Sequence, residues 1–182
     1  MRIGVAFPQT EVPADPMAAK AFAQAAEDLG YAHIMAFEHV LGVDLQRHPE
    51  WVVEAVQGQQ LGVHSMLHEP FVLFGYLAGL TTHIGFVTGI VALPQRQTAL
   101  LAKQAADLDV LSQGRFRLGV GLGWIPLEFE ALNETFTNRA SRFAEQVRVL
   151  RAFFTHESVT FHGRWHTIDA MGINPVMELC DS

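Results

Sequence analysis

Short apolar segments typical of buried β-strands alternate along this chain with segments that have the apolar spacing of α-helices. The strand candidates are residues 2–8, 32–37, 84–93 and 115–122, and the helix candidates are residues 16–29, 70–80, 97–111 and 139–154. Four strand-then-helix units in a row predict a parallel sheet covered by helices, because each return to a parallel strand needs a crossover. The fold class is therefore α/β. Periodicity alone leaves open a doubly wound sheet or part of a (β/α)8 barrel.

Two segments depart from this alternation. Residues 41–68 are too long for an ordinary connection, so an elaborated loop that could carry function is expected there. Residues 159–161 and 165–168 flank His162-Gly163 and predict a small hairpin with a two-residue turn. Because no repeat, linker or low-complexity stretch interrupts the pattern, residues 1–182 are expected to form one domain.

Composition excludes several classes of protein. Hydrophobic residues make up 49% of the chain and charged residues 17%, which is enough apolar material for a core and argues against disorder. The net charge of −7, without a Lys/Arg cluster, argues against a nucleic-acid partner. A single cysteine excludes a disulfide framework and favours a reducing cytoplasm. No apolar run approaches the roughly 18 residues of a membrane span, so no membrane association is expected.

A glycine-rich segment follows the fourth strand candidate. Gly119, Gly121 and Gly123 alternate with apolar residues, but the dinucleotide-binding fingerprint requires a third glycine where Trp124 stands. A Rossmann site is therefore disfavoured. Glycines at a strand end instead let a flat group or another backbone approach closely.

Polar residues end the second strand candidate. Glu38 and His39 follow the apolar residues 32–37 directly. Carboxyl ends of parallel strands border the crevice where α/β proteins bind ligands, and histidine exchanges protons near neutral pH. We favour a functional His39 over a structural histidine that caps a loop.

Other candidates carry weaker signals. Gly89, within Thr88-Gly89-Ile90, interrupts a strand and indicates either a bulge or a packing accommodation. His64 and His68 have the spacing of two helical metal ligands, but Gly62 makes a helix doubtful and no third ligand is evident, so no metal site is expected. Cys180 has no base beside it and is an unlikely nucleophile.

Several motifs together resemble the luciferase-like monooxygenase superfamily, and most closely its branch of F420-dependent oxidoreductases. They are VTGIVALPQRQTALLAKQAADLDVLS (87–112), GRFRLGVGLGW (114–124), EHV (38–40), HEPF (68–71) and FHGRWH (161–166). The resemblance covers about residues 1–176 in order and in register. It implies a TIM-barrel fold, of which this chain would supply about the first four βα units and the hairpin, as a C-terminally truncated member.

The resemblance also implies a cofactor and a site. Coenzyme F420, or alternatively FMN, would lie over the carboxyl ends of the strands, exchanging a hydride with a small organic substrate. The implied catalytic residues are His39, which assists proton transfer, and Glu38. The implied cofactor-binding residues are Pro8, Thr88, Gly89, Ile90, Gly121, Gly123 and Trp124. Thr88-Gly89-Ile90 matches the strand-three bulge of the family, which often has a non-prolyl cis peptide bond.

Two alternatives to F420 chemistry stay open from the sequence. One is a monooxygenase that uses reduced FMN and molecular oxygen. The other is a truncated, inactive remnant or an interaction module. Half a barrel would leave sheet edges unpaired, so a homo-oligomer or an aggregation-prone chain is expected.

Overall fold

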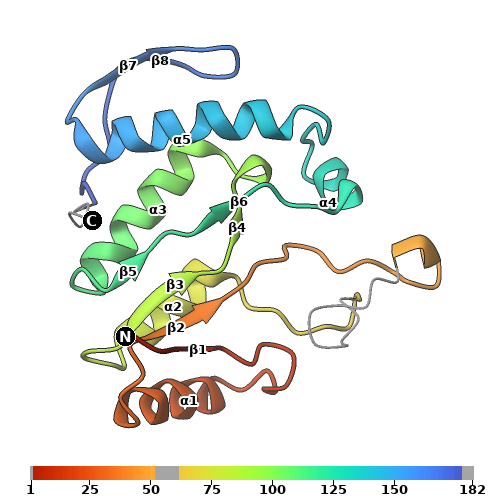
Figure 1. The fold of residues 1–182 in the computed structure, drawn as a ribbon, viewed down its shortest axis with the longest axis vertical. Coiled ribbons are helices and arrows are strands. Elements are labelled where there is room, and N and C mark those ends of the chain that lie inside the picture. Colours follow the sequence, from red (N-terminus) through yellow and green to blue (C-terminus); the bar gives the residue numbers. More distant parts are fainter. Residues whose placement is uncertain (1, 52–61, 178–182) are drawn as a thin grey trace.

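Four parallel strands form the central sheet, in the order β1-β2-β3-β5 (Figure 1). The computed structural model describes residues 2–51 and 62–177. The strands are β1 (Gly4–Ala6), β2 (His33–Ala36), β3 (Gly85–Thr88) and β5 (Phe116–Arg117). Each neighbouring pair is parallel, with Gly4 opposite His33 and Ala36 opposite Thr88. Order in the sheet therefore follows order in the sequence, and the predicted parallel α/β sheet is confirmed. Within the described residues the sheet is not closed.

The third strand candidate is divided at Gly89, where the sequence indicated an interruption, and the fourth is also divided in two, which corrects the continuous strand expected over 115–122. After β3 the chain continues as β4 (Val91–Ala92), and after β5 it continues as β6 (Val120–Gly121). The strands β4 and β6 pair in parallel with each other and form a separate two-stranded sheet. A cis peptide bond between Gly89 and Ile90 lies at the first break, at the position where the family resemblance implies one. The apolar pattern continues through both breaks, so periodicity could not locate them.

The helices cover one face of the sheet and agree closely with the sequence prediction. They are α1 (Pro16–Asp28), α2 (Pro70–Ala78), α3 (Thr98–Leu111) and α5 (Arg139–Thr155). The Asp15 side chain accepts a 2.9 Å hydrogen bond from the Met17 N–H, so the predicted N-cap of α1 is confirmed. A six-residue helix that periodicity did not predict, α4 (Pro126–Ala131), follows β6.

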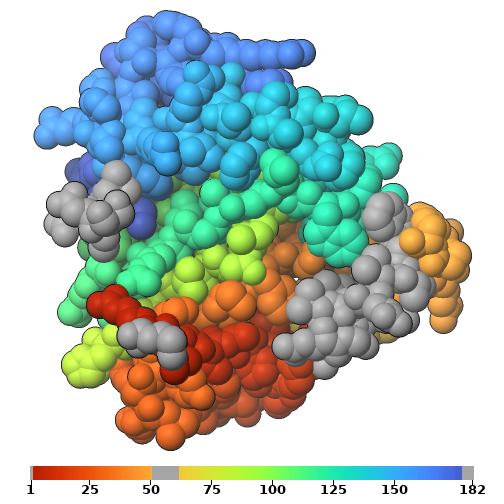
Figure 2. Space-filling model, in the orientation of Figure 1, coloured from red at the N-terminus to blue at the C-terminus, as the bar shows by residue number. Residues whose placement is uncertain are grey.

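The main core lies between the sheet and the helices. Side chains alternate along β2 and β3, so that Ile34 and Phe86 are fully buried whereas Met35 and Val87 are only half-buried. Phe86 packs on Phe74 of α2 with ring centroids 5.2 Å apart. The half-buried side chains therefore belong to the opposite face of the sheet. In Figure 2, the orange, yellow-green and green segments of the strands reach the surface in the middle of the molecule.

The segment that connects β2 to α2 has little regular structure. It contains the short helix η1 (Pro49–Trp51) and a bridge between Val43 and Gly62, and residues 52–61 of the expected loop lie outside the described residues. In the part of the chain that the structure describes, no helix is long and apolar enough to cross a membrane.

The hairpin forms at the predicted place but with a longer turn. Its strands are β7 (Val159–His162) and β8 (Thr167–Met171), so residues 163–166 make the connection instead of His162-Gly163 alone. The Glu145 carboxylate of α5 determines this geometry, because it accepts 2.9 Å hydrogen bonds from the N–H groups of Arg164, Trp165 and His166. It also accepts a 2.8 Å bond from the His166 ring. One buried carboxylate thus fixes the hairpin to α5.

Hairpin docking is expected to weaken in acid. Burial raises the pKa of Glu145, but the hydrogen bonds from His166 and from the three backbone N–H groups outweigh it and lower the pKa from 4.5 to about 2. A carboxylate with a depressed folded pKa stabilises the fold above its unfolded pKa and loses this contribution as the pH falls through the folded value. The wild type should therefore exceed Glu145→Gln in free energy of unfolding at neutral pH. This difference should shrink as the pH falls from 4.5 to about 2.

Chemical unfolding of both proteins across this pH range measures the difference. Glu157→Gln is the matched control, since Glu157 is exposed beside the same hairpin. A pH-independent gap between wild type and Glu145→Gln would contradict the assignment.

Candidate functional site

The carboxyl ends of the parallel strands bring most of the predicted site residues to one edge of the sheet. His39 follows β2, Ile90 follows β3, and Trp124 follows β6. The His39 and Trp124 rings meet edge to face, with centroids 6.0 Å apart. Pro8 follows β1 at the same edge, and its carbonyl accepts hydrogen bonds from the N–H groups of Glu11 and Val12. The neighbour of Pro8, Gln9, links the ends of β1 and β2 through a 2.6 Å bond to the Phe37 carbonyl.

His39 is held by a glutamate that the sequence did not identify. Glu128 of α4 is buried, and its Oε2 lies 3.4 Å from Nδ1 of His39. Its Oε1 accepts hydrogen bonds from the N–H groups of Val40, at 2.6 Å, and Leu41, at 3.2 Å. The amide of Gln95 donates a further 3.0 Å bond to Oε2. The residues beyond β2 are therefore attached to α4 through this one carboxylate.

Glu128 remains ionised in this environment. Burial raises the pKa of its carboxyl group, but hydrogen bonds from His39, Gln95 and the Leu41 N–H outweigh it and lower the pKa below the ordinary value. An ionised carboxylate only accepts hydrogen bonds. The arrangement therefore supplies a fixed negative charge beside the His39 ring.

Glu38 lies in a separate ion pair. Its side chain is 2% exposed and is bound by the guanidinium of Arg96, which donates from Nε at 2.8 Å and from its terminal nitrogen. The second oxygen of Glu38 accepts a 3.0 Å bond from the Ala92 N–H. Arg96 also reaches Glu69, at 2.6 Å. Both oxygens of Glu38 are thus engaged in holding the end of β2 against β4.

Glycines control the approach of the strands around the breaks. Thr88 Oγ1 accepts from the Gly119 N–H and donates to the Gly119 carbonyl, both at 2.8 Å. A Cβ at Gly119 would lie 2.1 Å from the Thr88 carbonyl oxygen, and one at Gly89 would lie 2.4 Å from Met35 Sδ. Thr88 and Gly89 therefore serve the packing of the sheet itself.

Gly121 and Ile90 lie side by side at the exposed end of the sheet. A Cβ at Gly121 would lie 2.8 Å from Cδ1 of Ile90. Ile90, Leu122 and Trp124 are 40%, 40% and 47% exposed. All three follow strands of the two parallel sheets, so exposed apolar surface is present beyond the strand ends. Gly123 has a positive φ of 71°, and a Cβ there would lie 3.0 Å from the Phe129 ring, so this glycine allows α4 to pack closely.

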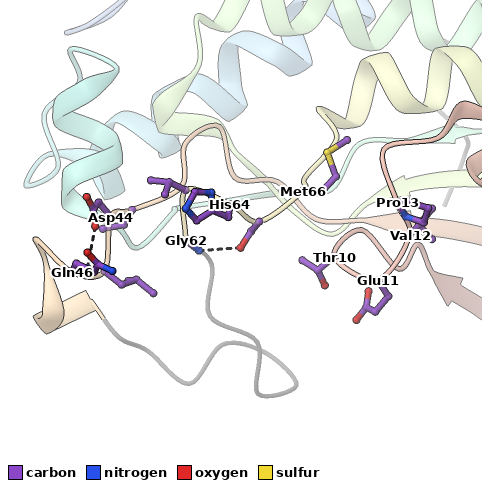
Figure 3. A pocket seen from close by; sticks show the side chains of 13 residues that line it. Thr10, Glu11, Val12, Pro13, Asp44, Gln46, Gly62, His64 and Met66 are labelled. Carbon is purple, nitrogen blue, oxygen red and sulfur yellow. Dashed lines mark hydrogen bonds between the residues drawn. The ribbon is translucent and has the colours of Figure 1, made fainter.

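Two cavities border the segment after β2. The larger, of about 840 Å³, lies between the turn after β1 and residues 43–46 and 62–66 (Figure 3). Thr10, Glu11, Asp44 and His64 are among its lining residues, and the Asp44 carboxylate accepts from the Gln46 N–H at 3.0 Å. The smaller, of about 520 Å³, lies between residues 41–48 and α4 and includes Glu128 in its wall. Concave space is thus present next to the strand ends.

The remaining candidates from the sequence are separated in the structure. His64 lies in a turn and His68 in a segment without regular structure, so they do not share a helix face. The His68 N–H donates to the Gln9 side chain at 2.9 Å. No group of three or more metal-ligating side chains is found among residues 2–51 and 62–177. Cys180 lies outside the described residues.

Comparison with known proteins gives consistent results. A family model described as luciferase-like monooxygenase matches residues 1–178. The chain is 35% identical to the uncharacterized protein Rv0940c of Mycobacterium tuberculosis over 107 residues, which are 59% of this chain and 37% of that protein. It is 30% identical to an FMNH(2)-dependent dimethylsulfone monooxygenase of Pseudomonas fluorescens over 111 residues, covering 59% of this chain and 30% of that enzyme.

Solved structures show the same fold. The monooxygenase RslO1 from Streptomyces bottropensis superposes with a TM-score of 0.78 at 24% identity, over 97% of this chain and 50% of that one. An F420-dependent secondary alcohol dehydrogenase in complex with an F420-acetone adduct superposes with a TM-score of 0.73 at 20% identity, over 98% of this chain and 50% of that one. The chain thus spans about half the length of these structures.

Proposed function

Because the chain belongs to the luciferase-like monooxygenase family, we propose that it forms the first four βα units of a TIM barrel that binds a flavin-type cofactor over the carboxyl ends of its strands. The proposed cofactor is coenzyme F420, and the proposed reaction is hydride transfer to or from a small organic substrate. The parallel order β1-β2-β3-β5, which follows the order of the sequence, supports the barrel.

Exposed apolar residues beyond the strand ends carry this proposal. Ile90, Leu122 and Trp124 each offer exposed apolar surface, and the Ile90 side chain packs directly over Gly121, where a Cβ would stand only 2.8 Å from its Cδ1. Cofactor sites are lined mainly by apolar and aromatic side chains, with a few polar groups that fix orientation. The residues present therefore fit the ring of a deazaflavin or flavin. Bound there, the cofactor would supply the hydride chemistry.

His39 would handle the proton that accompanies this chemistry. Its Nδ1 faces Glu128, and its other ring nitrogen, Nε2, is left to exchange a proton with the substrate. Trp124 contacts the ring edge to face and restricts its orientation. Glu38 would act indirectly, by holding the end of β2 through Arg96.

A monooxygenase that uses reduced FMN is the second candidate. The likeness to the FMNH(2)-dependent dimethylsulfone monooxygenase favours it. Fluorescence titration of the chain with F420, and separately with FMN, tests both candidates. Micromolar binding of F420 would support the first and of FMN the second. Binding of neither by a folded protein would contradict both and favour an inactive remnant or an interaction module.

Substituting Gly121 tests the location of the cofactor. In Gly121→Val the new side chain displaces the flexible end of Ile90, so we expect the protein to fold but to bind its cofactor at least about tenfold more weakly, a loss of about 1.4 kcal/mol. Gly62→Ala is a suitable control, since a Cβ there would approach its neighbours only to 3.6 Å. Unchanged affinity of Gly121→Val in the same titration would place the ring elsewhere.

We also propose that the chain self-associates. The outer strands β1 and β5 each have one hydrogen-bonded neighbour within the described sheet, and Met35 and Val87 are half-buried on its uncovered face. Unpaired strand edges favour association. Light scattering at micromolar concentration should therefore detect oligomers or aggregates, and a monodisperse monomer would overturn this expectation.

A further inference from the structure

The contacts of Glu128 determine which nitrogen of His39 carries the hydrogen. The Glu128 carboxylate already accepts hydrogen bonds from the backbone N–H groups of Val40 and Leu41 and from the side-chain amide of Gln95. The fourth polar neighbour is Nδ1 of His39, 3.4 Å from Oε2. A carboxylate offers no hydrogen in return, so an attractive contact requires the hydrogen to be on Nδ1.

We propose that Glu128 is a positioning residue for His39, which fixes the neutral imidazole as the Nδ1–H tautomer and leaves Nε2 as the proton-accepting atom. This inference rests on the proposed function for the role of His39 in proton transfer. It assigns to Glu128 an indirect role in the reaction. Glu128 acts through the ring that it holds.

The backbone on both sides of His39 is anchored by carboxylates. Before it, Glu38 is bound by Arg96 and by the Ala92 N–H. After it, the N–H groups of Val40 and Leu41 are bound by Glu128. Because residue 38 is held by Arg96 and β4 and residues 40 and 41 are held by α4, the position of His39 is fixed before any ligand binds. Such preorganisation is what a proton-transferring group requires.

The opposite edge of the ring, which carries Nε2, is not engaged by Glu128. The His39 side chain is 12% exposed, and in the part of the chain that the structure describes no hydrogen bond occupies Nε2. The edge-to-face contact with Trp124 disfavours rotation of the ring. A ring flip that placed Nε2 against Glu128 would also have to break the Nδ1 contact. The two constraints together favour one orientation with one open nitrogen.

Nitrogen-15 NMR of the labelled chain without cofactor tests this proposal directly. At a pH where the imidazole rings are neutral, the nitrogen-15 chemical shifts of the two ring nitrogens of each histidine report its tautomer. The His39 signals are assigned among the nine histidines by their disappearance in His39→Ala. We expect His39 to be mainly the Nδ1–H tautomer in the wild type. A wild-type His39 that is mainly Nε2–H would overturn the proposal, whatever the variants do.

Glu128→Gln and Glu130→Gln make a matched pair for the same measurement. Both remove one negative charge from α4, but Glu130 is exposed, and among the described residues the hydrogen-bonded carboxylate partner of His39 is Glu128. We expect Glu128→Gln to lose the Nδ1–H majority and Glu130→Gln to retain it. Equal tautomer ratios in the two variants would contradict the proposal. The F420 and FMN titrations report separately on the proposed function, so either hypothesis can fail alone.

Discussion

Replacing His39 with alanine is expected to lower turnover about 100-fold or more while leaving cofactor affinity nearly unchanged. General acid–base groups typically contribute a factor of this size, because they transfer a proton in the transition state. The His39 ring contacts Glu128 and Trp124, and its removal leaves the exposed apolar side chains of Ile90, Leu122 and Trp124 in place. Substrate turnover and cofactor titration should therefore respond differently to this one change.

A control histidine separates this effect from a general loss of structure. His162 is exposed on β7, away from the carboxyl ends of the parallel strands, so His162→Ala should retain wild-type turnover. If His39→Ala kept wild-type turnover under the cofactor that binds, the proton-transfer assignment would be wrong. If His39→Ala instead lost cofactor affinity, His39 would be a binding residue.

The helices and strands that the sequence predicted are those with a full apolar stripe. The bounds of α1, α2, α3 and α5 differ from the expected ranges by at most two residues at either end. The motif resemblance located the family correctly, since the family model covers residues 1–178. These features depend on local spacing or on a long run of matching residues, and both can be recognised from the sequence alone.

Other features depend on contacts between distant residues. The helix α4 has only six residues, too few to show a helical period, and its Glu128 acts 89 positions away from His39. Glu38 was predicted as a site residue beside His39, yet its structural partner Arg96 lies 58 positions further along the chain. The hairpin turn is set by Glu145 rather than by its own residues. A signal was nevertheless present for Glu128, because it lies in the segment directly after the family-like GRFRLGVGLGW motif.

Removing the guanidinium of Arg96 is expected to destabilise the fold strongly. In Arg96→Met the Glu38 carboxylate, 2% exposed, is left without its cation, and an uncompensated buried charge of this kind costs about 3–5 kcal/mol. The second acceptor of Arg96, Glu69, is 36% exposed in its side chain and can turn to water. Urea unfolding should show the loss as a lower midpoint. Arg47→Met is the control, since Arg47 is exposed and its loss should change stability little.

The double variant Arg96→Met/Glu38→Gln distinguishes the structural role of Glu38 from the catalytic role that its position beside His39 suggested. Glutamine removes the buried charge but keeps an oxygen for the Ala92 N–H, so we expect the double variant to regain much of the stability lost by Arg96→Met. Its turnover should recover in parallel if Glu38 only anchors β2. A double variant that regains its stability but stays inactive would show that the Glu38 carboxylate takes part in the reaction itself. Stability that fails to recover would mean that Arg96 stabilises the fold through contacts other than the ion pair, such as the Phe71 ring 5.4 Å from its guanidinium carbon.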